Sequence, residues 1–132
     1  PLFGVCVGMQ MLLDHSAEGD TPSLGLIPGE VVQFDLAGRT QADGSRFKVP
    51  QIGWNQVQPT RPHFMWTDVP DGSYFYFVHS YALEVTDATL ASCDYGQPFT
   101  AIVGRDNFFG AQFHPERSGS AGARLLQNFL EL

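Results

Sequence analysis

The segment at residues 4–8 constrains this chain most, because it places one cysteine, Cys6, between two glycines, Gly4 and Gly8. Residues 9–13, which read Met-Gln-Met-Leu-Leu, follow at once and form an apolar stretch suited to a helix. This order predicts a nucleophile elbow, in which a strand turns sharply into a helix and the central residue adopts a strained backbone conformation. Small residues on either side let the strand and the helix approach closely, and both glycines meet that demand.

An elbow at this point would also influence the reactivity of the Cys6 sulfur. Unpaired N–H groups at the start of a helix favour negative charge, so we expect the thiolate to be favoured over the thiol. A lone cysteine is also often a buried structural residue, and the segment by itself leaves this alternative open.

The charge and the cysteine content of the 132 residues exclude several classes of function. The net charge of -7, with few and scattered basic residues, argues against a nucleic-acid-binding surface. The two cysteines, Cys6 and Cys93, lie far apart without metal-ligand spacing, so we expect no metal and no cofactor. The sequence contains no signal peptide and no long apolar run, which predicts a cytoplasmic protein that does not associate with a membrane.

The start of the chain is unusual for an elbow. The sequence opens on Pro1, and only Leu2 and Phe3 precede the glycine, whereas a nucleophile strand normally sits inside a sheet built by earlier strand-helix units. We therefore expect residues 1–132 to be the C-terminal part of a single domain whose N-terminal part is missing.

Further elements follow from the sequence pattern. Apolar residues recur at helical spacing near the C-terminus, with Ser118 or Ser120 as the N-cap, which predicts a closing helix. Residues 73–81 are the most β-prone stretch, and we expect this strand to be buried on both faces. The remaining predicted strands or extended segments are residues 30–34, 47–49, 50–57 and 90–93 and a hairpin formed by 99–103 and 108–113. Together these elements predict an α/β fold with a mixed sheet flanked by helices.

A cysteine nucleophile needs a general base, and four histidines compete for that role. His15 would lie about 13 Å from Cys6 along a helix, which is out of reach, and His63 is in a loop without an orienting carboxylate. His114 is held in the extended region by the proline after it, so Glu116 can lie beside its ring. His79 ends an apolar strand and is either a ligand-binding group or a core histidine satisfied by the backbone.

The two ends of the chain together resemble the class I (triad) glutamine amidotransferases. The resemblance rests on Gly-Val-Cys-Val-Gly-Met-Gln at residues 4–10 and on Phe-His-Pro-Glu at residues 113–116. Within that family, three segments are similar to the glutaminase subunits of imidazole glycerol phosphate synthases: residues 50–55, 77–81 and 112–119. The resemblance covers residues 1–132 and implies a flavodoxin-like fold.

The resemblance implies a Cys-His-Glu triad. Cys6 would attack the side-chain amide of glutamine, His114 would transfer protons and Glu116 would orient His114. Ammonia would leave, and water would hydrolyse the remaining γ-glutamyl thioester to glutamate. The residue after the cysteine, Val7, would supply one N–H of the oxyanion hole. Substrate-binding roles are implied for Gln10, His79, Ser80 and Tyr81.

The resemblance also implies a partner. The ammonia would pass within a heterodimer to a cyclase subunit, a (β/α)8 barrel that makes imidazole glycerol phosphate for histidine biosynthesis. We expect the interface at Gln51, Trp54 and Asn55, because an aromatic group beside polar amides suits a protein contact. A core position for Trp54 remains equally open.

Two alternatives stay open. The chain could be the glutaminase of another synthase, of the anthranilate, GMP or aminodeoxychorismate type. It could also be an inactive fragment that only binds a partner, because in the family the second oxyanion donor comes from a glycine-rich loop that would precede Pro1. Loss of one such donor typically slows a reaction about a hundred- to a thousand-fold.

Overall fold

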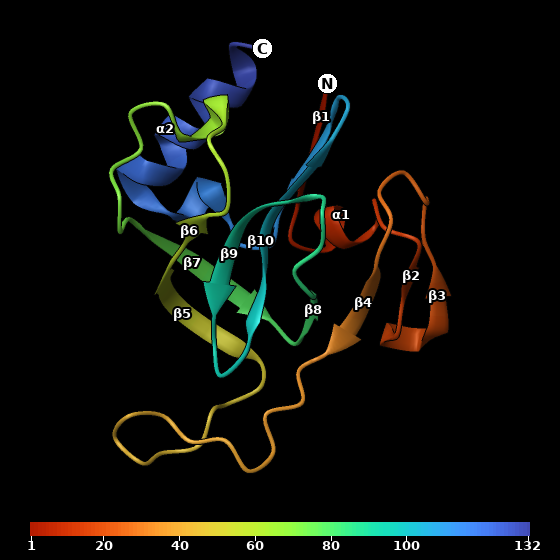
Figure 1. Cartoon of the computed structure of the whole chain (residues 1–132), viewed down its shortest axis with the longest axis vertical. Helices are drawn as coiled ribbons and strands as arrows, with labels where there is room; N and C mark the ends of the chain where they lie inside the picture. The colour runs from red at the N-terminus through yellow and green to blue at the C-terminus, as the bar shows by residue number, and fades with distance from the viewer.

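The computed structural model describes all residues, Pro1–Leu132, and contains a five-stranded mixed sheet with the order β1-β11-β10-β9-β6 (Figure 1). Strand β1 pairs in parallel with β11, whereas the other neighbours are antiparallel. The expected α/β fold with a mixed sheet is therefore confirmed. The strands are β1 (Leu2–Val5), β6 (Gln58–Pro59), β9 (Thr89–Asp94), β10 (Pro98–Arg105) and β11 (Phe108–Ala111).

Two smaller sheets complete the strand structure. One has the order β3-β2-β4-β8, and in the other β5 pairs antiparallel with β7. Their strands are β2 (His15–Ser16), β3 (Thr21–Pro22), β4 (Glu30–Gln33), β5 (Gln51–Gln56), β7 (Tyr74–His79) and β8 (Tyr81–Leu83).

The helices are few, and only α2 (Gly119–Leu130) is long. Ser118 occupies its N-cap position as expected, but the hydroxyl makes no capping bond and instead contacts β7 and His114. The others are α1 (Val7–Gln10) and the 3-10 turns η1 (Glu18–Asp20), η2 (Phe64–Trp66) and η3 (Pro115–Arg117). None of these helices has the length and apolar character needed to cross a membrane.

The apolar interior lies on both sides of the five-stranded sheet. Between this sheet, β7 and α2, a cluster of aromatic side chains is closed to solvent, with Phe77 at its centre against Phe99 and Phe113. A second cluster lies beneath the first helix, where Met9 and Leu12 pack with Val31 of β4. The elbow at Cys6 therefore joins two elements, β1 and α1, that are each held by core packing.

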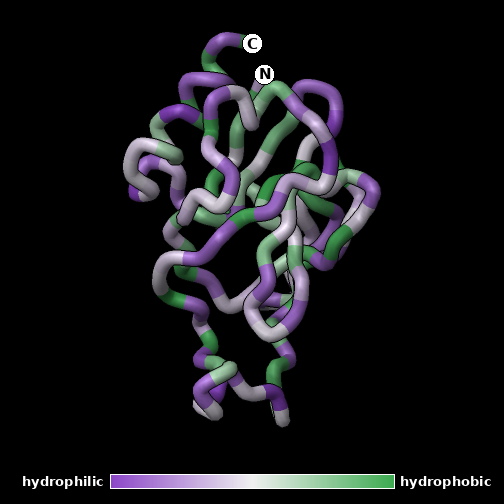
Figure 2. The backbone as a smooth tube through the Cα atoms, turned by 60° about the vertical axis from the view of Figure 1, so that its left-hand side comes forward, coloured by the Kyte–Doolittle hydropathy of each residue, from purple (hydrophilic) through white to green (hydrophobic).

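Two predictions about strands are wrong. Residues 47–49 form no strand and belong to a loop over residues 35–50 that extends away from the body of the molecule, at the lower end of Figures 1 and 2. Strand β7 is not buried on both faces, because Phe75 is buried whereas Tyr74 is 55% exposed. The buried residues alternate with partly exposed ones along β7, because one face packs on the aromatic core whereas the other face, with Tyr76 and Val78 only partly buried, is less covered.

Candidate active site

The parallel pairing of β1 with β11 brings the two ends of the sequence together. In this pairing Val5 is opposite Ala111, so both strands end at the same edge of the sheet. The backbone N–H of Cys6 donates to the Ala111 carbonyl at 2.8 Å. Cys6 and the segment Gln112–His114 therefore follow neighbouring strands at the same edge, where α/β sheets usually place their ligand-binding groups.

The predicted elbow at Cys6 is confirmed. Cys6 has φ 55° and ψ -109°, a left-handed conformation that costs a non-glycine residue about 1–3 kcal/mol, and α1 begins at the next residue. Gly4 is required by the close approach of strand and helix, since a Cβ there would lie 2.4 Å from the Gly8 carbonyl oxygen. The side-chain position of Gly8, in contrast, faces open space. Only one of the two glycines is therefore demanded by packing.

These two glycines allow a matched stability test. We expect Gly4→Ala to lower the free energy of unfolding by about 1–3 kcal/mol, because the backbone must move to accommodate the methyl group. Gly8→Ala should not lower the free energy of unfolding, because alanine favours a helix and its methyl group would contact no neighbouring atom. Urea unfolding of both variants measures the difference, and equal losses would contradict the packing role of Gly4.

The Cys6 thiol is partly buried and contacts two polar groups. Its Sγ donates to the Val78 carbonyl at 3.7 Å and accepts from Gln112 Nε2 at 3.7 Å. Burial raises the pKa of this thiol, although the N–H of Val7 and the Gln112 amide act in the opposite direction. The expectation of a favoured thiolate is therefore wrong: α1 is only four residues long, and desolvation outweighs its N–H groups.

His114 and Glu116 lie together as predicted. Nδ1 of His114 is 3.1 Å from Oε2 of Glu116. The backbone path differs from the prediction, because residues Pro115–Arg117 form the turn η3 rather than continuing an extended strand. The His114 N–H donates to the Tyr76 carbonyl at 2.9 Å, and the Ser118 hydroxyl donates to the His114 carbonyl at 2.6 Å.

This anchoring fixes the backbone of His114 on β7. The ring makes no hydrogen bond to Cys6 Sγ in this structure, and its Nδ1 is occupied by the carboxylate. Nε2 is consequently the nitrogen left for a reacting group. Catalytic hydrogen bonds often form only when substrate binds, so the missing bond does not exclude His114 as the base.

Gln10 is buried, with 8% of its surface exposed, and its amide joins three elements of the site. Nε2 donates to the Tyr81 carbonyl and to Gln112 Oε1, both at 3.0 Å. Its Oε1 makes no hydrogen bond within the chain. Gln10 also lines a cavity of about 150 Å³. The other residues that line this cavity are Val7, Met11, Ser16, Glu18, Thr21 and Ser23.

The segment around His79 is adjacent to these groups, but the histidine ring is fully engaged. Nδ1 donates to the Tyr81 carbonyl at 2.9 Å, so Nε2 of the neutral ring accepts from the Gln51 side-chain amide at 2.8 Å, with the NH₂ group of that amide facing the ring. Burial lowers the pKa of His79 to about 4, so the ring is neutral at pH 7. The carbonyl of Ser80 accepts from the Phe34 N–H. His79 is thus a core histidine whose two ring nitrogens are both hydrogen-bonded. Only the backbone of residues 79–81 remains able to contact a ligand.

The remaining predicted residues are placed as follows. His15 lies between Asp20 and Glu30, and His63 Nδ1 accepts from the Met65 N–H. Both histidines therefore have other partners than Cys6, but His15 lies on strand β2 and not along the first helix as predicted, because α1 ends at Gln10.

The three expected interface residues differ in exposure. Trp54 is 54% exposed, so it is not a core aromatic. Gln51 is only 3% exposed and contacts His79, so it cannot belong to the same surface. Asn55 is intermediate in exposure, and its side chain donates to the Asp94 carbonyl at 3.0 Å.

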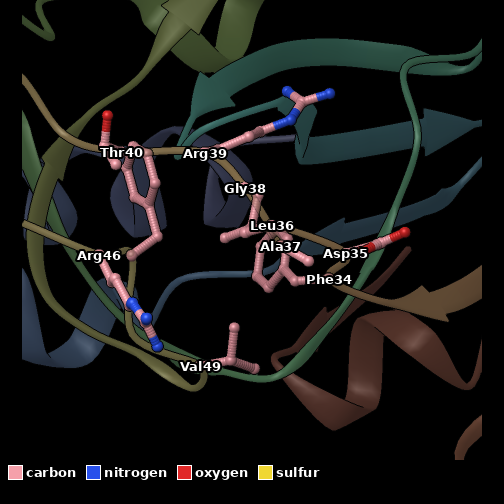
Figure 3. Close-up of a pocket in the computed structure, with 10 residues that line it drawn as sticks. Phe34, Asp35, Leu36, Ala37, Gly38, Arg39, Thr40, Arg46 and Val49 are labelled. Atoms are coloured by element: carbon pink, nitrogen blue, oxygen red, sulfur yellow. The ribbon is translucent and has the colours of Figure 1, made fainter.

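The largest cavity lies elsewhere. It is an open pocket of about 560 Å³ that is lined by Phe34 and by residues of the protruding loop, including Arg39 and Arg46 (Figure 3). None of the predicted site residues lines it. No group of three or more His, Cys, Asp or Glu side chains is arranged to hold a metal ion.

Sequence reasoning assigned no role to two residues of this site, Gln112 and Glu18. Gln112 is completely buried between Cys6 and Gln10, and Glu18 is a wall of the cavity beside Gln10. The position of Gln112 directly before the Phe-His-Pro-Glu motif is the one sequence signal that could have drawn attention to it.

The chain is similar to known proteins over its whole length. The family model described as glutamine amidotransferase class-I matches residues 1–132. A protein of Aromatoleum aromaticum named imidazole glycerol phosphate synthase subunit HisH is 52% identical over 98% of this chain and 62% of its own length. A protein of Chromobacterium violaceum with the same name is 54% identical over 98% of this chain and 61% of its own length.

Solved structures are similar in fold at much lower identity. A crystal structure described as a glutamine amidotransferase gives a TM-score of 0.63 at 19% identity, over 98% of this chain and 59% of that chain. The present chain spans about 62% of the length of the curated relatives that it matches.

Proposed function

Because the chain belongs to the class I glutamine amidotransferase family, we propose that it forms part of the glutaminase subunit of an imidazole glycerol phosphate synthase. The observation that carries this proposal is the meeting of the Cys6 elbow with the His114–Glu116 pair at one sheet edge. The relatives at 50–54% identity support the choice of synthase. In this proposal residues 1–132 are the C-terminal part of a single domain in a cytoplasmic enzyme.

In the proposed reaction, Cys6 Sγ forms a bond to the side-chain carbonyl carbon of glutamine. The thiol proton passes through His114 to the amide nitrogen, the C–N bond breaks and ammonia leaves. Water, deprotonated by His114, then attacks the γ-glutamyl thioester, and glutamate leaves as Cys6 regains its proton. No oxidant, metal or cofactor takes part in this sequence.

A general base is needed because burial raises the pKa of Cys6, so the resting sulfur is a thiol at neutral pH. His114 can supply the base, since Glu116 holds its Nδ1 and leaves Nε2 for the sulfur. The Val7 N–H faces the same sulfur, and we assign it as one donor to the oxyanion.

The cavity beside Gln10 is the proposed place for the amino-acid end of glutamine. Glu18 supplies a carboxylate that suits an α-ammonium group, and Gln10 Oε1 supplies a free acceptor. The Tyr81 carbonyl accepts from Gln10, so the backbone of Ser80 and Tyr81 would contact the same end of the substrate. The α-carboxylate requires further donors, for which the N–H groups of this segment are candidates.

The proposed contact with a cyclase subunit uses the outer face of the β5–β7 sheet. This face presents Ile52, Trp54 and Tyr74, each more than half exposed. The Trp54 ring lies 5.9 Å from that of Tyr76, and the Arg117 guanidinium stacks 4.6 Å above Tyr76. Aromatic and arginine side chains of this kind are enriched at the energetic centres of protein interfaces.

A substitution of Trp54 tests this contact. Trp54→Ala in the full-length protein should weaken binding to the cyclase subunit about 30-fold or more, which is typical of an interface hot spot. The free energy of unfolding should change much less, because the side chain is 54% exposed. Calorimetric titration measures the affinity, and Leu130→Ala, at a position 78% exposed on α2, is the surface control. Unchanged affinity for Trp54→Ala would remove this face from the interface.

The function itself is tested by glutamine hydrolysis in the full-length protein, alone and with the cyclase subunit. We expect glutamate formation that increases when the cyclase is added, and transfer of the amide nitrogen of ¹⁵N-labelled glutamine into imidazole glycerol phosphate. Hydrolysis that is stimulated only by another synthase would replace the partner in this proposal. If no partner supports glutamine hydrolysis, the proposal that this protein is a glutaminase would be rejected.

A further inference from the structure

Gln112 is a fully buried polar side chain to which the proposed chemistry gives no part. It lies directly after β11, with none of its surface exposed. A buried amide is costly unless its donors and acceptor are satisfied, so its partners define its role. Those partners are Gln10, at 3.0 Å from Oε1, and the Cys6 sulfur, at 3.7 Å from Nε2.

The orientation of this amide is determined by a chain of hydrogen bonds that begins at a backbone carbonyl. The carbonyl of Tyr81 can only accept, so the Gln10 atom 3.0 Å from it must be the NH₂ group. That same Nε2 faces Gln112, so the Gln112 atom opposite it must be the oxygen. The NH₂ group of Gln112 is therefore directed at Cys6, and a flip of the amide would break the chain.

The two polar contacts of Cys6 favour opposite protonation states. The Val78 carbonyl accepts the S–H, a contact that exists only for the thiol. The Gln112 N–H donates to the sulfur, a contact that strengthens when the sulfur becomes negative. After the proton has left, Gln112 is the side chain that still holds the sulfur.

We propose that Gln112 is a positioning residue for Cys6, holding its sulfur through an amide that Gln10 and the Tyr81 carbonyl orient, and stabilising the thiolate formed during attack. The role in catalysis rests on the proposed function, whereas the effect on the thiol does not. Gln10 also borders the cavity proposed for the substrate. The same series of hydrogen bonds therefore links the substrate cavity to the Cys6 sulfur.

The test is the pH profile of alkylation of Cys6 by iodoacetamide in the full-length protein, with the modified residue identified by mass spectrometry. Gln112→Met keeps the size of the side chain but removes the donor, and Gln112→Asn withdraws the amide by one methylene. Both variants should raise the pH at which the alkylation rate is half-maximal, the alkylation midpoint, by about one pH unit. A shift of this size is expected when a hydrogen-bond donor to a charged group is lost. Gln10→Met, which releases the orientation of Gln112, should move the midpoint in the same direction by less.

A matched control separates positioning from general stability. Asn128 is also a buried amide, bonded to the Met65 and Thr67 carbonyls and without contact to Cys6. Asn128→Leu should lower the melting temperature but leave the alkylation midpoint unchanged. If Gln112→Met does not fold, Gln112→Asn and Gln10→Met carry the test.

An unchanged midpoint in the folded Gln112 variants would overturn the proposal, as would an equal shift in Asn128→Leu. Alkylation requires neither glutamine nor a partner, so this result is independent of glutaminase activity. A shifted midpoint in a protein that never hydrolyses glutamine would reject the proposed function and leave the positioning role intact.

Discussion

Cys6→Ala should lower glutamine hydrolysis by the full-length protein about 10⁴-fold or more, because it removes the atom that would form the thioester. The fold should survive, since alanine is smaller and Cys6 is only partly buried. Glutamate release in the presence of the cyclase subunit is the measurement. Activity within tenfold of the unaltered protein would end the assignment of Cys6 as nucleophile.

Cys93 provides the control for this prediction. It is 2% exposed, and burial raises the pKa of its thiol to about 12, so it should be unreactive at neutral pH. A glutamine analogue that carries an electrophilic ketone should label Cys6 alone, and Cys93→Ala should retain both labelling and hydrolysis. Labelling at Cys93 would contradict the assignment.

The second large effect is expected at His114 and Glu116. His114→Ala removes the proposed base and should lower kcat by about 10⁴-fold. Glu116→Gln keeps the size of the side chain but can present an NH₂ group to Nδ1, which favours a misplaced ring or the wrong tautomer. We expect kcat to fall substantially for this variant, but by less than for His114→Ala, while KM for glutamine stays close to its normal value.

The double variant distinguishes orientation from an independent role. Groups that act as one unit lose little more together than the more damaging single change does. The double variant should therefore be as slow as His114→Ala, measured as kcat and KM in the cyclase-bound enzyme. Multiplicative losses would mean that Glu116 acts without His114, and its orienting role would be abandoned. Ser118→Ala is a useful control, because it loosens the His114 backbone without touching the ring.

Local sequence order was sufficient to predict the parts of the site that are close in the chain. Gly4 before Cys6 predicts the sharp turn, because only a residue without a Cβ fits against the Gly8 carbonyl. Glu116 two residues after His114 predicts their contact, which the structure places at 3.1 Å. The path was wrong in detail, since the turn η3 rather than an extended strand brings the two side chains together.

Local order was not sufficient for properties that depend on burial. The helix start at Cys6 suggested a favoured thiolate, but segments from elsewhere in the chain desolvate the sulfur and raise its pKa. The residues around Trp54 could not reveal whether its side chain is exposed, because the answer depends on which face of the β5–β7 sheet packs on the core. The same pleat that exposes Trp54 buries Gln51, so two of the expected interface residues were separated.

The sequence by itself determined which chemical groups this protein has and how near neighbours along the chain are arranged: a cysteine in a tight turn and a histidine beside a glutamate. Only the tertiary structure decided that these two segments meet, through the parallel pairing of β1 with β11. It also decided that Gln112, 106 positions from Cys6, directs its amide at the sulfur. The physical reason is that hydrogen-bond direction and desolvation depend on all the groups surrounding an atom, and here most of these come from distant parts of the chain.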